Sequence, residues 1–314
     1  MSGGFWGSDF ALENGRIRVR KTGVVLRLDR ALVEEALVWF AYYVPVRLRG
    51  LWMRLTRPGP RVWFTPDVPR PWYLVWASAA WAGVRPARRP EEAEAAFYFD
   101  DSARGATPNA GPGRRINFAC TDVTKSRVAR VFEEVFGYPL MVDPASATGP
   151  LVEKGEDNGV HDGRIVQAPC PALPGKTYQR LIDNTETCEG RTLVADLRTP
   201  CVGGRPVTVF IKKRPVDDRF ANHNCAVELT TPEAVFSPAE IETIGRFCAA
   251  MGMDWGGLDI LRDRADGRLY IVDVNKTDMG PPIALPLNDK LRATGLLADA
   301  FVLLIRQEPR VGAA

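Results

Sequence analysis

The residues best suited to do chemistry in this sequence are three polar side chains inside two strand-like apolar runs, GLDILR and GRLYIVDVN. A turn at Asp266-Gly267 would pair the runs as an antiparallel hairpin. Asp259 then lies opposite Asp273 or its neighbour, and Asn275 points to the same side as Asp273 because side chains alternate along a strand. The pattern predicts that two carboxylates and an amide oxygen converge on one patch.

Two carboxylates held together in a sheet repel each other and lose hydration unless a cation lies between them. Oxygen ligands of this kind suit Mg²⁺, or Mn²⁺ in its place, with nucleotide phosphates and water as the other ligands. We therefore predict a metal site at Asp259, Asp273 and Asn275. In the alternative interpretation Asp259 caps a turn and Asn275 begins a loop, which does not account for all three residues together.

Elements with clear sequence signals surround this hairpin. Apolar residues at helical spacing predict a helix after Thr124 that stops at Gly137, and a second helix that starts with Ser237 and Pro238 and stops at Gly252. Between the two helices, apolar runs predict several strands. Before the first helix, the run AAFYF predicts a strand of a small α/β unit.

The hairpin resembles the C-terminal metal-binding hairpin of the ATP-grasp superfamily. Residues 115 to 280 are similar to its ribosomal-protein-glutamate-ligase-like branch. The resemblance implies an α+β or α/β protein with an ATP-grasp fold, in which two α/β subdomains clasp the nucleotide. From the preceding residues we expect a small α/β domain and, before it, an N-terminal basic amphipathic segment. The resemblance also implies ATP as cofactor. The predicted domains are 1–65 (basic aromatic segment), 66–115 (small α/β domain), 116–182 and 183–290 (the two ATP-grasp subdomains) and 291–314 (C-terminal helix and tail).

The same resemblance implies roles for individual residues. The implied nucleotide-binding residues are Lys125, Lys154, Gln179, Leu181, Ile182, Asp196, Lys212 and Asn222. Gln179, Leu181 and Ile182 belong to the segment YQRLID, which matches the hinge that reads the adenine edge. The implied catalytic residues are Arg198, Arg214 and Arg219.

The reaction remains open between two enzyme classes and a non-enzyme. A carboxylate-amine ligase would form an acyl phosphate with ATP and pass the acyl group to an amine. Asp273 stands where the ligases usually have Glu, and its Asp-x-Asn run is similar to the inositol-phosphate kinase branch, so a kinase that phosphorylates a hydroxyl is the alternative. A nucleotide-binding module without turnover is the third interpretation.

The N-terminal part of the chain is basic and aromatic. Residues 1–90 contain 15 Lys and Arg against 6 Asp and Glu, whereas the whole chain has a net charge of +3. The longest uncharged run, Ala36 to Val46, has 11 residues and is too short to span a membrane. Residues 31–60 therefore predict an amphipathic helix that either lies on an anionic membrane, near a lipid-linked acceptor, or packs on the protein body.

Composition limits the remaining alternatives. The 314 residues are 46% hydrophobic and 25% charged, which is typical of a globular protein with a sizeable core. Six scattered cysteines lack a metal-ligand spacing, and we expect reduced thiols in a cytoplasmic protein, with the inner face of the membrane as the alternative location. The expected partner is a small-molecule substrate and not a nucleic acid, since no nucleic-acid-binding motif accompanies the basic residues. The oligomeric state stays open.

Overall fold

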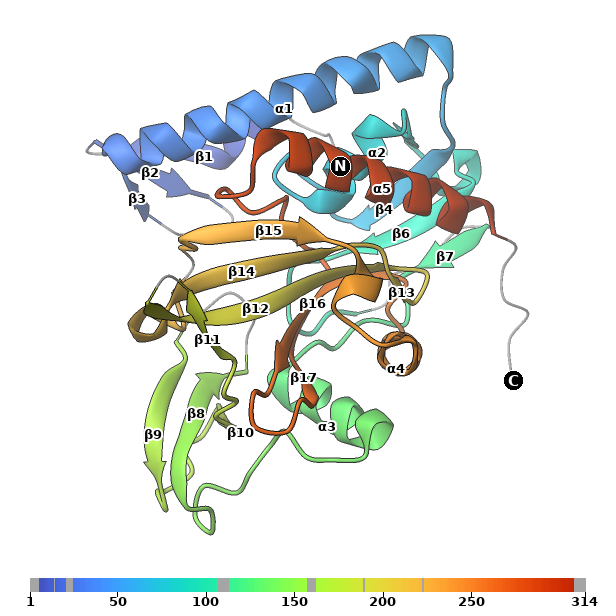
Figure 1. Cartoon of the computed structure of the whole chain (residues 1–314). Helices are drawn as coiled ribbons and strands as arrows, with labels where there is room; N and C mark the ends of the chain where they lie inside the picture. Colours follow the sequence, from blue (N-terminus) through green and yellow to red (C-terminus); the bar gives the residue numbers. More distant parts are fainter. Residues whose placement is uncertain are drawn as a thin grey trace.

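The computed structural model describes residues 6–13, 15–20, 25–106, 113–156, 162–188, 190–221 and 223–307 (Figure 1). Over this part of the chain, four β-sheets and five α-helices form a mixed α/β architecture, as predicted. The α-helices are α1 (Arg30–Thr56), α2 (Leu74–Trp81), α3 (Lys125–Phe136), α4 (Pro238–Ala250) and α5 (Leu287–Arg306). Short 3-10 helices are η1 (Trp6–Asp9), η2 (Pro90–Glu92), η3 (Val216–Asp218) and η4 (Pro232–Ala234).

The strands of the N-terminal half make two sheets. β1 (Phe10–Glu13), β2 (Arg16–Val19) and β3 (Val25–Arg27) form a small antiparallel sheet beside the start of α1. β4 (Arg61–Pro66), β5 (Arg85–Pro86), β6 (Ala95–Phe99) and β7 (Arg114–Ile116) form a parallel sheet in the order β5-β4-β6-β7. The predicted boundaries after residues 65 and 115 fall inside β4 and β7, so both strands belong to this sheet rather than to the preceding or following domain.

The parallel sheet explains why AAFYF is apolar at every position. Parallel sheets are covered on both faces, so their central strands are buried on both sides. All five residues of β6 are buried: Phe97 packs with α2 and α5, and Tyr98 packs with Phe118 on the other face. Helix α5 begins at Leu287, four residues before the predicted boundary at 291.

The strands of the C-terminal half form a seven-stranded antiparallel sheet. Its strands are β11 (Thr185–Cys188), β12 (Arg191–Val202), β13 (Arg205–Pro206), β14 (Val209–Pro215), β15 (Ala226–Thr230), β16 (Trp255–Arg262) and β17 (Leu269–Asn275). The order is β15-β14-β12-β16-β17, and β11 and β13 also pair with β12. β8 (Gly149–Gly155), β9 (Arg164–Ala168) and β10 (Lys176–Arg180) form a separate sheet in the order β10-β8-β9.

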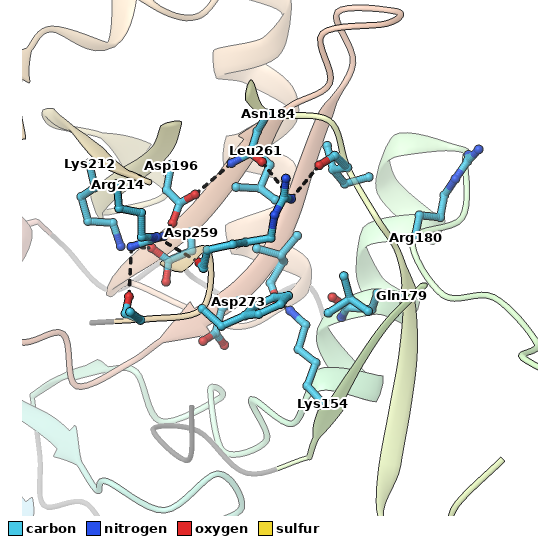
Figure 2. A pocket seen from close by; sticks show the side chains of 16 residues that line it. Lys154, Gln179, Arg180, Asn184, Asp196, Lys212, Arg214, Asp259, Leu261 and Asp273 are labelled. Carbon is cyan, nitrogen blue, oxygen red and sulfur yellow. Dashed lines mark hydrogen bonds and ion pairs between the residues drawn. The ribbon is translucent and has the colours of Figure 1, made fainter. Parts of the chain in front are cut away.

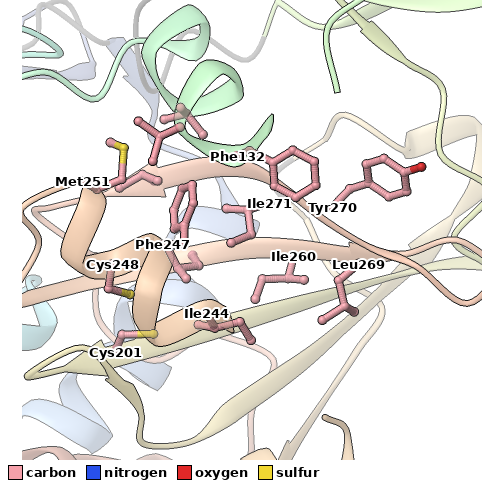
Figure 3. Close-up of a cluster of buried hydrophobic side chains, with 14 of the residues drawn as sticks. Phe132, Cys201, Ile244, Phe247, Cys248, Met251, Ile260, Leu269, Tyr270 and Ile271 are labelled. Atoms are coloured by element: carbon pink, nitrogen blue, oxygen red, sulfur yellow. The ribbon is translucent and has the colours of Figure 1, made fainter. Parts of the chain in front are cut away.

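One face of the large sheet packs against α3 and α4 (Figure 3). Phe132 of α3 and Phe247 of α4 pack over Ile260 and Ile271 of the hairpin, with which they share the largest hydrophobic core. Both helices start and stop as predicted within one or two residues, and Ser237 forms a capping box at the start of α4. Although α3 falls within the predicted 116–182 subdomain, it packs on β17 and α4, whereas β8 to β10 stand apart from this core.

Helix α1 crosses the outside of the molecule and contacts α2 and α5 through Tyr42, Val46 and Gly50. Tyr42 also shares a hydrogen bond with Thr294 of α5, with 2.7 Å between the hydroxyl oxygens. Among the described helices, none has both the length and the apolar character required to span a bilayer.

Candidate functional site

A cavity of about 190 Å³ lies between the β10-β8-β9 sheet and the large sheet (Figure 2). One wall comes from β8, β10 and the loop that follows, and the other from β12, β14, β16, β17 and the segment after β14. The lining residues are Val152, Lys154, Gln179, Arg180, Ile182, Asn184, Asp196, Lys212, Arg214, Arg219, Phe220, Ala221, Asp259, Leu261, Val272 and Asp273.

The hairpin of β16 and β17 supplies the carboxylates of the cavity. Asp259 is the direct cross-strand partner of Asp273, as predicted. A bulge next to this pair makes Val272 the extra residue, because Ile260 pairs with Ile271. A bulge redirects side chains: Ile271 enters the core below the sheet, while Val272 and Asp273 both line the cavity. Asn275 pairs with Gly257 and shares the face of Asp273, but it lies beyond the cavity wall.

Asp259 is held by two cations. It accepts hydrogen bonds from Arg198 Nη1 at 2.7 Å and from Lys212 Nζ at 3.0 Å. Burial by itself would raise the pKa of Asp259, but the charges of Arg198 and Lys212 outweigh burial and hold this pKa well below its usual range. Asp259 is therefore ionised at any pH at which the protein would work.

Arg198 joins the hairpin to the loop that follows it. Besides Asp259, it forms an ion pair with the buried Asp278. Burial raises the pKa of Asp278 and the charge of Arg198 opposes this rise. A side chain at Gly257 would collide with the Asp278 carboxylate and approach Arg198, so the absence of a Cβ there makes room for this pair.

A second charged group lies on the same wall of the cavity, on β12 and β14. Asp196 forms an ion pair with Arg214 and accepts a hydrogen bond from Asn184 Nδ2 at 3.0 Å. Arg219 donates to the Ile182 carbonyl at 3.0 Å and to Asn184 Oδ1 at 3.2 Å. Asn184 thus connects Asp196 with Arg219 across the loop after β10. Burial lowers the pKa of both arginines from the ordinary value, since it removes hydration from the charged form.

The facing sheet contributes Lys154 and Gln179. Lys154 on β8 reaches across the cavity, with its Nζ 3.4 Å from the Val272 carbonyl oxygen. Burial lowers the pKa of Lys154 to about 8, although the charge of Asp273 partly offsets this effect. Gln179 is buried, and its Nε2 atom has no hydrogen-bond partner among the described residues. A buried amide without a partner is costly, and this one lines a cavity, so it is available to a ligand.

Of the residues predicted from sequence, nine line this cavity: Lys154, Gln179, Ile182, Asp196, Lys212, Arg214, Arg219, Asp259 and Asp273. Two others lie directly behind it, since Arg198 contacts Asp259 and Lys125 Nζ is 2.5 Å from an Asp273 oxygen. Leu181 and Asn275 are not part of the lining, and Asn222 lies outside the described residues.

Sequence reasoning missed Asn184, Phe220 and Asp278. Asn184 follows the hinge segment, Phe220 is in the KKRPVDDRFANHN run, and Asp278 is three residues after the predicted ligand Asn275. The only signal for these three residues in the sequence was that each lies within a few positions of a predicted site residue. However, their contacts depend on how three separate loops approach one another, which no local pattern encodes.

The donor set fits a divalent cation with oxygen ligands. Asp259 and Asp273 face one cavity from adjacent strands, and carboxylate oxygens are ligands that Mg²⁺ prefers. Among the described residues, no group of three or more His, Cys, Asp or Glu side chains could hold a metal. A magnesium ion here would thus have two protein carboxylates, with Asn275 as the predicted amide ligand, and would need water and phosphate oxygens to complete its coordination.

Comparison with known proteins finds no matching protein-family model and no matching curated protein. Several solved structures are similar. The ATP-grasp ligase PsnB in complex with a minimal precursor has 14% identity and a TM-score of 0.48, over 79% of this chain and 99% of that one. A RimK-domain ATP-grasp protein from Sphaerobacter thermophilus has 15% identity and a TM-score of 0.44, over 77% and 99%. D-alanine–D-alanine ligase from Bacillus anthracis with ATP has 10% identity and a TM-score of 0.45, over 79% and 97%.

PsnB and the Sphaerobacter thermophilus protein are described as ATP-grasp proteins, and PsnB and the Bacillus anthracis protein as ligases. Every TM-score is below 0.5, and the functional proposal therefore rests on the residues of this chain.

Proposed function

We propose that this chain is a Mg-dependent ATP-grasp enzyme that binds ATP in the cavity between the two sheets. The observation that carries the proposal is the pair Asp259 and Asp273, two opposed carboxylates in a cavity that five Lys and Arg side chains also line. Such a site attracts a polyanion and a divalent cation together, and a nucleoside triphosphate with Mg²⁺ is the common ligand of that composition.

The cavity has an apolar part suited to an adenine ring. Val152 and Ile182 from one wall and Leu261 and Val272 from the other are apolar lining residues. Gln179 lies at the same side of the cavity as Lys154 and carries the unpartnered amide (Figure 2). We assign these residues to the nucleobase, because ligand pockets combine apolar walls with a few polar groups that fix orientation.

The charged part suits the phosphates. Lys154, Lys212 and Arg214 would neutralise phosphate oxygens, and Asp259 and Asp273 would hold Mg²⁺. When bound, the metal ion supplies charge neutralisation at the β- and γ-phosphates. Lys125 would orient Asp273 from behind, and Arg198 would do the same for Asp259. In this assignment Arg198 is a positioning residue, because it contacts two carboxylates and does not line the cavity.

For the reaction we favour a carboxylate-amine ligase. An oxygen of the substrate carboxylate attacks the γ-phosphorus, the bond to the leaving ADP oxygen breaks, and an acyl phosphate forms. The amine then attacks the acyl carbon, phosphate leaves, and the amine loses a proton. Arg214 and Arg219 line the cavity and would stabilise the negative charge of this transfer, which depends on positioning and electrostatics.

A kinase is the second candidate, and one residue favours it. Asp273 occupies the position where a longer Glu would serve in the ligases that the hairpin resembles, and Asn275 follows on the same face of β17. In a kinase a hydroxyl oxygen attacks the γ-phosphorus, its proton leaves, and ADP is released with no amine involved.

The test is ADP release by the purified protein with Mg-ATP, against pools of amino acids and peptides and, separately, pools of phosphorylatable alcohols. Mass spectrometry identifies the product. A new amide formed together with ADP and phosphate establishes a ligase, and the gain of one phosphate on a single compound establishes a kinase.

The Asp273→Asn variant and a binding measurement separate the remaining outcomes. Calorimetry with Mg-ATP should detect binding by the unmodified protein and weaker binding by the variant. Tight binding without turnover on either pool would favour a nucleotide-binding module, and absence of Mg-ATP binding would overturn the proposal.

A further inference from the structure

Helix α1 is apolar on the side that faces away from the protein. The body-facing residues Tyr42, Val46 and Gly50 are buried. The opposite side carries a row of apolar residues at helical spacing whose side chains are exposed. They are Val33, Leu37, Phe40, Val44, Leu48, Leu51, Trp52 and Leu55. Leu37, Leu48 and Leu55 are 64%, 62% and 86% exposed. At 1.5 Å per residue, the row from Val33 to Leu55 is about 33 Å long.

Arginines border this row in the second half of the helix. With 3.6 residues per turn, Arg47 and Arg54 fall on one edge of the apolar face and Arg49 on the other. Arg47 and Arg49 are exposed, whereas Arg54 is half-buried and donates a hydrogen bond to the Val84 carbonyl at 3.4 Å. Residues 36–66 contain five arginines and neither Asp nor Glu. Long cationic side chains at the edge of an apolar face can lie along it while their charged ends stay at the water interface.

A basic hollow opens beside the same half of α1. This cavity of about 510 Å³ lies between the end of α1, the end of α2 and the last turns of α5. Arg49, Arg57 and Arg306 line it, and Asp299 is the one acidic side chain in the lining. The Arg49 guanidinium lies 4.5 Å from the ring centre of Trp81, an arrangement that holds its charge at the rim.

We propose that α1 and this hollow, together called the docking face, attach the protein to the surface of an anionic phospholipid membrane. The apolar row would lie among the acyl chains just below the headgroups, with the helix parallel to the membrane plane. Arg49, Arg57 and Arg306 would receive a lipid phosphate in the hollow, and the exposed Arg47 would meet a neighbouring headgroup. Figure 1 shows α1 at the outer side of the molecule, with the β8–β9 end and α3 at the far side.

Charge favours this occupant over a second copy of the chain. An anionic surface would pair with Arg47, Arg49, Arg57 and Arg306 at once, whereas a second copy presents the same basic border and brings like charges together. Apart from Asp299 in the hollow, the face has few acidic residues that could pair two such borders, because Glu34 and Glu35 are confined to the beginning of the helix.

The experiment is partition of the full-length protein between buffer and vesicles, measured by flotation. Vesicles of phosphatidylcholine with phosphatidylglycerol are compared with vesicles of phosphatidylcholine alone. We expect binding to the anionic vesicles that weakens with salt, and much weaker binding to the neutral ones. Leu48→Asp with Leu55→Asp should reduce partition more than tenfold, because each leucine would lose most of its transfer into the bilayer. Arg57→Ala should reduce it about fivefold, the equivalent of about 1 kcal/mol for one arginine near the surface.

Matched substitutions elsewhere serve as controls. Leu173→Asp changes an exposed leucine of the loop before β10, and Arg130→Ala removes an exposed arginine of α3. Both should partition like the unmodified protein. Equal partition of the unmodified protein and the Leu48 and Leu55 double variant would overturn the proposal. A concentration-dependent dimer that the double variant converts to monomer, without any vesicle binding, would overturn it in favour of a second copy.

Discussion

Replacing Lys154 by Met should stabilise the ligand-free protein and weaken ATP binding at the same time. Lys154 has its charged amine in a poorly hydrated position, where burial lowers its pKa to about 8. An ordinary lysine has a pKa of about 10.4, and each factor of ten in proton affinity corresponds to about 1.4 kcal/mol. The protonated form is therefore destabilised by about 3 kcal/mol in the folded state. Because Lys154 retains some contact with solvent, we expect the variant to gain about 1–3 kcal/mol near pH 7.

The pH dependence gives the sign of this effect. Below pH 8 both the folded and the unfolded protein carry the proton on Lys154. The buried charge then destabilises the folded protein by its full amount. Between about pH 8 and the ordinary lysine pKa, the unfolded protein binds more protons at this site, and the stability of the unmodified protein rises with pH relative to the variant. The stability difference between the two proteins should therefore shrink as the pH approaches the upper end of this window.

Urea denaturation of both proteins at pH 7 and at pH 9.5 to 10 measures this difference, and the subtraction removes the titration of all other groups. Calorimetry with Mg-ATP measures the accompanying loss of affinity. A Lys154→Met variant that is less stable than the unmodified protein at pH 7, or a stability gain that does not diminish at high pH, would refute the assignment of the pKa to burial. Unchanged ATP affinity would refute the assignment of Lys154 to the phosphates.

Three further substitutions test other parts of the structure. Asp273→Asn keeps the shape of the strand but removes one of the two opposed carboxylates, so Mg-dependent turnover should fall at least about 100-fold, with an unchanged circular dichroism spectrum. Gly257→Ala forces a methyl group against Asp278 and should destabilise the protein by about 1–3 kcal/mol, measured by urea denaturation; a neutral effect would mean that the loop moves aside freely. Tyr42→Phe removes the hydrogen bond to Thr294 and should lower stability by about 0.5–1.5 kcal/mol in thermal unfolding, whereas no change would show that this bond does not hold α1 to α5.

Local patterns in the sequence predicted the elements that carry the site. The spacing of Val128, Val131 and Phe132 identified α3, and the Ser237-Pro238 start identified α4. The Asp266-Gly267 turn fixed the hairpin register well enough to place the two carboxylates opposite each other. The bulge at Val272 could not be predicted, because it follows from the packing of Ile271 beneath the sheet rather than from the alternation of residue types.

Helix α1 shows where local patterns stop being informative. Pro45 removes a backbone donor and usually breaks or bends a helix, yet α1 continues through it to Thr56. Contacts of Tyr42 and Val46 with α2 and α5 compensate for this defect, and those contacts are distant in sequence. Because the helix is apolar on two sides, periodicity alone could not tell which side packs on the body. Of the two alternatives considered from sequence, the packed helix describes the face with Tyr42 and Val46. The interfacial helix describes the exposed outer face under the proposal above.

The charges around the cavity constrain the proposed chemistry further. Five Lys and Arg side chains and three carboxylates line it, and each carboxylate is already paired with a cation of the protein. Free ATP would add much more negative charge than this positive excess can balance, whereas ATP complexed with Mg²⁺ carries less and matches it more closely. Under the proposed function, Lys212 can exchange Asp259 for a phosphate while Asp259 turns to the metal, so that neither group is left buried without a partner. The pairing seen here thus favours the metal complex over the free nucleotide, and it gives a reason for the carboxylates and the cations to lie within contact of each other.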